Sequence, residues 1–218
     1  MYVPASDQCN TLTSTFGSAS TAGTSAFTIK ITQIECGSKM KAPNGCLQYH
    51  TANTGTISSF NFNNAAGVHL TDQDYSICIR PDRTACAICY YVDAQTDWGV
   101  GVPNGIAGIG VKGVDTNCGA PGIALFAKGG GNDLVQIPGG QCDSPDNNGA
   151  LVALFPSDRY CGTSFGCMTA VDGTSTAGTV CTNQRPFKVS FKTDSVEYTN
   201  GDNEGGDIAR ARGFELSK

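Results

Sequence analysis

Eleven cysteines are spread along this chain of 218 residues, and they constrain its fold more than any other feature. In a reducing compartment so many thiols would stay unpaired and open to oxidation, whereas in an oxidising one each pair becomes a cross-link that stabilises the fold by about 2–4 kcal/mol. The cysteines therefore predict a secreted, extracellular protein held by disulfides. Because their number is odd, at least one sulfur is left over, as a free thiol or for a bridge between chains.

The composition favours short strands and turns over long helices. Glycine is abundant at 28 residues, and charged residues make up only 15% of the chain. The net charge is −5 and the basic residues are scattered, which argues against nucleic acid as a partner. The longest apolar run, residues 150–155, is far shorter than the roughly 18 residues that a membrane span needs, so we expect none.

Alternation of apolar and polar residues predicts a series of β-strands. The pattern is clearest in residues 27–32 and 187–192, where every second side chain is apolar. Further candidates are residues 75–79, 88–92, 134–137, 151–155 and 214–216. Asn-Gly dipeptides between these runs mark turns. Many short strands separated by turns predict an all-β protein, and specifically a β-sandwich.

Residues 99–114 alternate glycine with aliphatic residues and carry a single charge, Lys112. The simpler interpretation is a glycine-rich pair of strands that turns at residues 103–105 and buries its aliphatic face. The alternative is a self-association surface, because a flat glycine-rich strand can pair with another molecule along its edge. The residues that would form that surface are Gly99, Val100, Val102, Ile106, Ile109 and Val111.

Five separated segments are informative together: CLQYHTANTGTISSFNFNNAAGVHLTDQDYSICIR at 46–80, NDLVQIPGG at 132–140, DRYCG at 158–162, RPFKVSFKTDS at 185–195 and RGFEL at 212–216. They resemble the CUB domain, in the divergent form found in secreted arthropod proteins. Their order fits one module of residues 45–218, for which the resemblance implies an antiparallel jelly-roll β-sandwich with disulfides. Residues 1–44 lie outside it, and we expect them to form a short N-terminal β segment, the remnant of a preceding β domain.

The resemblance also implies a disulfide pattern. It joins Cys46 to Cys78, leaves Cys9 to pair with Cys36 on the N-terminal segment, and gives Cys161 one of three partners: Cys118, Cys142 or Cys181. Cys86 and Cys89 form a lone Cys-x-x-Cys without the strand-to-helix context of a redox site or the second pair of a zinc site. We therefore interpret them as members of two separate structural bridges.

The sequence offers no catalytic constellation. A hydrolytic triad needs a nucleophile, a base and an orienting carboxylate, yet the chain has only two histidines, His50 and His69. No Gly-x-Ser-x-Gly elbow is present, and GTSFG at 162–166 resembles one only superficially. We interpret both histidines as surface or turn residues and expect no catalytic residue and no enzyme.

Calcium is the cofactor that the resemblance raises, because many CUB domains hold it with carboxylates from loops at one end of the sandwich. Asp133 and Asp194 match two of the family's ligands. The family's glutamate is missing, and Asp115, three residues before Cys118, is the only stand-in. The alternative is that Asp133 and Asp194 cap turns.

These observations together predict a non-enzymatic, secreted structural or interaction protein. It would act through protein–protein contacts, including self-association, with a rigid cross-linked surface that loses little conformational entropy when a partner binds. Two alternatives remain open at this point: a calcium-dependent ligand-recognition module, and the accessory domain of a secreted protease.

Overall fold

The structure is a computed structural model, which describes residues 1–6, 8–13, 28–63, 67–101, 118, 133–143, 158–162, 165–166, 178–194 and 212–218. Within these residues the regular structure is β-strand, apart from one short 3-10 turn. The described part contains no helix that could cross a bilayer. The elements are β1 Cys46–His50, β2 Thr56–Ser58, β3 Asp74–Ile79, β4 Ile88–Tyr90, η1 Gln95–Asp97, β5 Trp98–Gly99, β6 Leu134–Gln136, β7 Gln141–Asp143, β8 Arg159–Tyr160, β9 Thr179–Thr182, β10 Lys188–Lys192 and β11 Gly213–Ser217.

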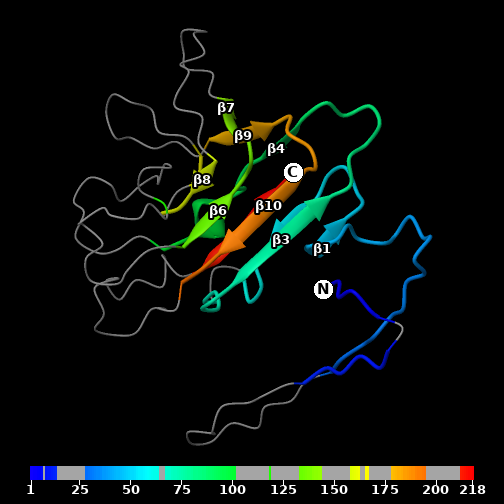
Figure 1. The fold of residues 1–218 in the computed structure, drawn as a ribbon. Helices are drawn as coiled ribbons and strands as arrows, with labels where there is room; N and C mark the ends of the chain where they lie inside the picture. The colour runs from blue at the N-terminus through cyan, green and yellow to red at the C-terminus, as the bar shows by residue number, and fades with distance from the viewer. Residues whose placement is uncertain are drawn as a thin grey trace, which may run out of the picture.

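The strands form three ladders in the order β1-β3-β10-β6-β8, β2-β11-β5 and β4-β9-β7. In Figure 1 the first ladder crosses the middle of the molecule, and red β11 is visible behind β10. A bridge between Tyr91 and Ser217 connects the strand region of β4 to β11. The β1–β3 pair is parallel, and the other paired strands are antiparallel. This is the all-β sandwich that the sequence predicted.

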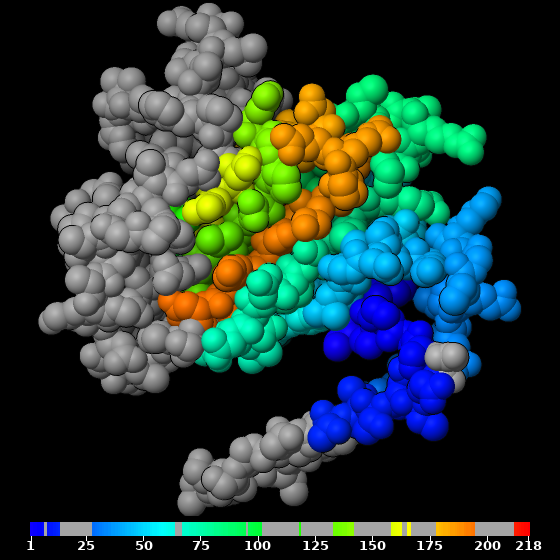
Figure 2. All heavy atoms as spheres, viewed as in Figure 1, coloured from blue at the N-terminus to red at the C-terminus, as the bar shows by residue number. Residues whose placement is uncertain are grey.

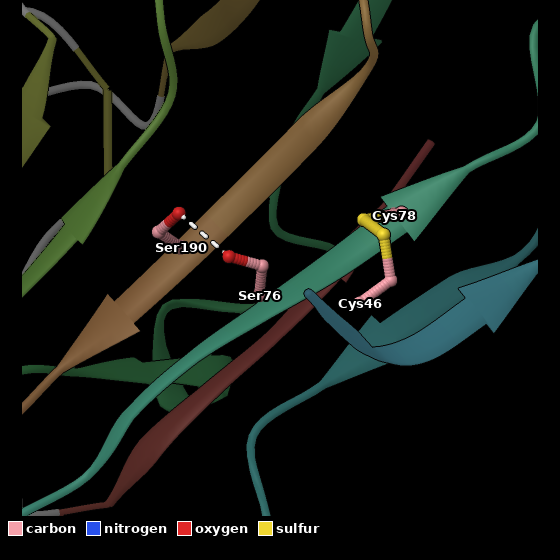
Figure 3. Close-up of a disulfide and its surroundings, with 4 residues drawn as sticks. All are labelled: Cys46, Ser76, Cys78 and Ser190. Carbon is pink, nitrogen blue, oxygen red and sulfur yellow. Dashed lines mark hydrogen bonds between the residues drawn. A yellow bond between two sulfur atoms is a disulfide. The ribbon is translucent and has the colours of Figure 1, made fainter. Parts of the chain in front are cut away.

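The central strands β3 and β10 show why these segments pair. In each strand alternate side chains are apolar, so one face can be buried while the other stays polar. Ile77 lies opposite Val189 in the antiparallel ladder, and both side chains are completely buried. On the polar face the hydroxyls of Ser76 and Ser190 approach to 3.1 Å (Figure 3). The strands predicted at residues 75–79 and 187–192 are therefore confirmed.

Aromatic side chains fill the core between the layers. The ring of Trp98 lies 4.8 Å from that of Phe165 and 6.1 Å from that of Phe214, whose ring is 5.3 Å from Phe191. All four residues are at most 1% exposed to solvent. Aromatic pairs at such distances add to the stabilisation from area burial alone. The described chain thus has a continuous apolar core of its own.

Three disulfides lie in the described residues. Cys46–Cys78 joins β1 to β3, as the resemblance implied, and Figure 3 shows this bridge. Cys118–Cys161 selects one of the three partners left open for Cys161. Cys89–Cys181 joins two residues that face each other in the β4–β9 ladder.

Three further cysteines, Cys9, Cys36 and Cys86, are exposed free thiols. The expected Cys9–Cys36 bridge is therefore not formed. In the described residues no hydrogen-bonded ladder joins the segment around Cys9 to the one around Cys36. Of the two bridges expected for the Cys-x-x-Cys pair, the structure forms only the one from Cys89.

Residues 28–32, the described part of the strand predicted at residues 27–32, form no strand. Residues 28–36, which we call the arm, contain no strand, and Figure 2 shows the blue N-terminal region beside the body of the molecule. Ile29, Ile31 and Ile34 are 51%, 78% and 39% exposed. Alternation shows that a segment has an apolar face, but a strand also needs a partner edge, and no described strand of this chain lies along the arm. Of the N-terminal β segment expected in residues 1–44, residues 7 and 14–27 lie outside the described residues, and the described ones form no strand.

Candidate functional site

The glycine–aliphatic segment does not offer the surface that its sequence suggested, so far as the structure describes it. Gly99 belongs to β5 and pairs with Gly213 of β11, while Val100 forms a bridge with Gly162. Both residues are buried, Val100 completely. They were wrongly assigned to a self-association surface, because the sandwich uses this stretch to close its core. Val102, Ile106, Ile109 and Val111 lie outside the described residues.

The two aspartates considered for calcium do meet. Asp133 directly precedes β6 and Asp194 follows β10, and the antiparallel pairing of these strands brings the two positions together. The carboxylate oxygen Oδ1 of Asp133 accepts a hydrogen bond of 2.8 Å from the backbone N–H of Asp194. Asp133 is only 1% exposed. Asp115 lies outside the described residues.

A histidine completes this arrangement, against the expectation that it lies on the surface. His69 is 2% exposed, and its Nε2 lies 3.4 Å from Oδ2 of Asp133. The imidazole also meets the Phe191 ring edge-on, with 5.6 Å between the ring centres. The expectation of a surface residue was wrong, because Asp133 and Phe191, both far along the chain, pack against this imidazole.

Gly101 packs against the same carboxylate. A Cβ atom at this position would lie 2.7 Å from Oδ2 of Asp133, which is too close for an unstrained contact. The absence of a side chain therefore allows the backbone to enclose the acid. Asp133 is held between a main-chain donor, an imidazole and a glycine, and it links the loop before β3 to the ends of β6 and β10.

The described partners of Asp133 differ from the ligands that calcium takes, and Asp115, the third candidate ligand, lies outside the described residues. Calcium takes six to eight oxygen ligands, whereas a nitrogen of His69 lies beside the second carboxylate oxygen of Asp133. Asp194 turns its backbone N–H, a donor, toward the acid. Within the described part of the chain no group of three His, Cys, Asp or Glu side chains could hold a metal ion. The arrangement suits a buried structural link.

A shallow groove of about 370 Å³ lies where the edge strands β1 and β2 of the two layers approach each other. The amide nitrogen of the Gln48 side chain donates to the carbonyl of Ser58 at 3.0 Å and so bridges the layers. His50 lies 3.3 Å from the same side chain, and burial together with the charge of Lys218 lowers the pKa of His50. Tyr2 donates its backbone N–H to Leu47 of β1 at 2.7 Å. Met1 and Tyr2 thus line the groove, and Tyr2 is hydrogen-bonded to edge strand β1.

Exposed large apolar side chains are concentrated before β1. In the described residues those found in the first 44 positions are Met1, Val3, Leu12, Ile29, Ile31, Ile34 and Met40. Only Leu70 and Tyr91 are of this kind in the remainder. A sandwich with a closed core and an adjoining apolar segment is the arrangement expected where the segment binds another protein surface. The alternation in residues 27–32 had predicted a β-strand, so these exposed side chains were not expected.

Comparisons with known proteins agree with this architecture. A search of curated proteins and a search of solved structures each found no match. A family model for the animal CUB domain matches residues 43–217, a range that contains every described strand and all three disulfides. The chain belongs to the animal CUB domain family.

Proposed function

We propose that this chain is a non-enzymatic, secreted structural or interaction protein that acts through protein–protein contacts and associates with itself. CUB domains are generally extracellular modules that mediate such contacts. The observation that carries the proposal is the contrast between the module, which closes its own core, and the arm, whose three isoleucines are exposed. Apolar side chains that find no partner within the described chain favour one in another molecule.

The placement of the histidines supports a role without catalysis. His69 is enclosed against Asp133 and Phe191, so a substrate could not reach its ring without opening the fold. His50 lies beside Gln48, which spans the gap between the layers. Each imidazole therefore has a structural explanation in the described residues. A hydrolytic function would need a base that is both exposed and aligned with a nucleophile.

The disulfides support both secretion and the mode of action. Three bridges cross-link the module, and such bridges persist in oxidising compartments. A cross-linked sandwich holds its surface in one conformation, so little side-chain and loop entropy is lost when a partner binds. The module would act as the rigid body that positions the arm.

Sedimentation velocity on the oxidised full chain, over a wide range of concentrations, tests the proposal. We expect a reversible increase in mass with concentration, because the exposed apolar area is small and the association correspondingly weak. A non-reducing peptide map of the same sample would separate reversible association from disulfide cross-linking. A monomer at all concentrations would contradict self-association.

A further inference from the structure

Three properties of the arm are unexpected for a segment of a chain that folds alone. Residues 28–32 of the arm alternate as in a strand, yet the arm forms no strand in the described structure. Ile29, Ile31 and Ile34 are exposed, so their apolar surface stays in water. A turn closed by the Ser38 N–H and the Glu35 carbonyl, at 3.0 Å, ends the arm before the chain continues to β1. These properties fit a segment that becomes a strand only beside another one.

The sequence of the arm is complementary to itself when two copies run antiparallel. If Lys30 of one copy lies opposite Glu35 of the other, Ile31 lies opposite Ile34 and Thr32 opposite Gln33. Two-fold symmetry then repeats each of these pairs. Opposite charges, and apolar side chains facing each other, are the cross-strand pairs that stabilise antiparallel ladders.

Other registers do not combine the pairing of opposite charges with the pairing of isoleucines. Shifting one strand by a single residue in one direction places Lys30 opposite Ile34, and in the other direction it places Ile31 opposite Glu35. A register with Lys30 opposite Lys30 brings like charges together, which destabilises the pair. Within residues 28–36, Lys30 and Glu35 are the two charged side chains, so their pairing fixes a single register.

We propose that the partner of the arm is the arm of a second copy, paired antiparallel with Lys30 opposite Glu35. The inference rests on the proposed function and gives its self-association an interface and a register. Each face of the ribbon carries Ile29 and Ile31 of one copy beside Ile34 and Cys36 of the other. A lone two-stranded ribbon is marginal in water, so the dimer forms at high concentration and dissociates on dilution.

Charge reversal tests the register. Lys30→Glu and Glu35→Lys each place two pairs of like charges in the ribbon and are expected to weaken dimerisation about tenfold. The double variant Lys30→Glu/Glu35→Lys restores opposite charges and recovers the wild-type affinity. Lys39→Glu changes the same charge beyond the paired residues and is the matched control, with little effect. The arm is exposed, so these variants leave the module folded.

Cross-linking tests the same register with a different readout. Position 29 lies opposite Cys36 of the second copy, on the same face of the ribbon. With oxidised glutathione added as the oxidant, Ile29→Cys is therefore expected to give a covalent dimer in which the introduced thiol forms a disulfide with Cys36 of the other chain, while the glutathione is reduced. Thr28→Cys points to the opposite face and serves as the control, without that bridge. Non-reducing electrophoresis and peptide mapping of the dimer band distinguish the two.

The outcomes separate this inference from the function on which it rests. A dimer that ignores both charge reversals and lacks the Ile29→Cys cross-link overturns arm pairing and leaves self-association in place. A wild-type chain that stays monomeric at every concentration overturns both. Loss of dimerisation in the single variants, with recovery in the double variant, supports the register.

Discussion

Among single residues, Asp133 has contacts that link distant segments of the described fold. It is a buried acid within reach of His69 and bonded to the main chain at Asp194. A buried carboxylate is costly unless it is hydrogen-bonded or paired. Here both partners come from loops that strands β3, β6 and β10 bring together. The acid that resembled a calcium ligand in the sequence thus joins three parts of the fold.

Replacing this acid should destabilise the module strongly. Asp133→Ala removes the acceptor of the Asp194 N–H and leaves His69 without its carboxylate, so we expect a loss of about 3 kcal/mol in the free energy of unfolding. Asp74→Ala is the matched control, because Asp74 is 76% exposed and lies 3.9 Å from an exposed Lys192. It should change stability by less than about 1 kcal/mol. Urea unfolding with the disulfides intact measures both, and equal effects would contradict the structural role of Asp133.

Tyr75 predicts an alkaline limit to stability. Burial raises its pKa to about 12, although the Phe60 N–H that donates to its hydroxyl acts in the opposite direction. The unfolded chain, with a tyrosine pKa near 10, loses this proton first. The contribution of Tyr75 is therefore complete below about pH 10 and is lost as the pH rises toward 12, at a cost of about 2–3 kcal/mol.

Unfolding of the alkylated protein across this pH range checks the prediction. Alkylation blocks the exposed thiols of Cys9, Cys36 and Cys86, which would otherwise attack the disulfides at high pH. Tyr75→Phe should be less stable near neutral pH but lose less of its stability between about pH 10 and 12. Burial also raises the pKa of Tyr90, so part of the slope remains in this variant. An identical slope in both proteins would contradict the assignment.

At the scale of elements, alternation identified strands correctly where the chain supplies a partner. Residues 187–192 and 27–32 have the same kind of pattern, yet the first became β10 between β3 and β6 while the second forms no strand in the described structure. The alternation within one segment shows which side chains form an apolar face, but it does not show whether the edge of another strand lies close enough to pair with the segment. The burial of His69 and the choice of Cys118 for Cys161 were unpredictable for the same reason, since each depends on distant segments.

The Cys89–Cys181 bridge, which joins β4 to β9, allows the contribution of one cross-link between strands to the free energy of unfolding to be measured. It closes a loop of 92 residues, the longest of the three described bridges, and the chain-entropy argument assigns such a loop about 4–5 kcal/mol. Cys89→Ala/Cys181→Ala should lower the free energy of unfolding by roughly that amount. Cys86→Ala, which removes an exposed free thiol nearby, should be close to neutral. Urea unfolding of the three proteins is the check, and a double variant as stable as the wild type would refute this attribution.

At the scale of the whole molecule, the chain consists of a closed module and the arm, for which we propose a partner strand from a second copy. The module has its core, its disulfides and the Asp133 link, and residues 43–217 match its family. The arm has alternation and exposed isoleucines without a partner strand in the described chain. If the arms pair as proposed, the module folds on its own and the arm mediates association, so the two processes can be measured separately.

Hydrogen exchange of the native full chain over a range of protein concentrations tests this division most directly. We predict that amides of β3 and β10 are protected at every concentration, because they depend on the module alone. Amides of residues 28–36 should exchange rapidly in dilute solution and become protected as dimers form. Protection of the arm that does not change with concentration, or arm amides that remain unprotected in the most concentrated sample, would contradict the account.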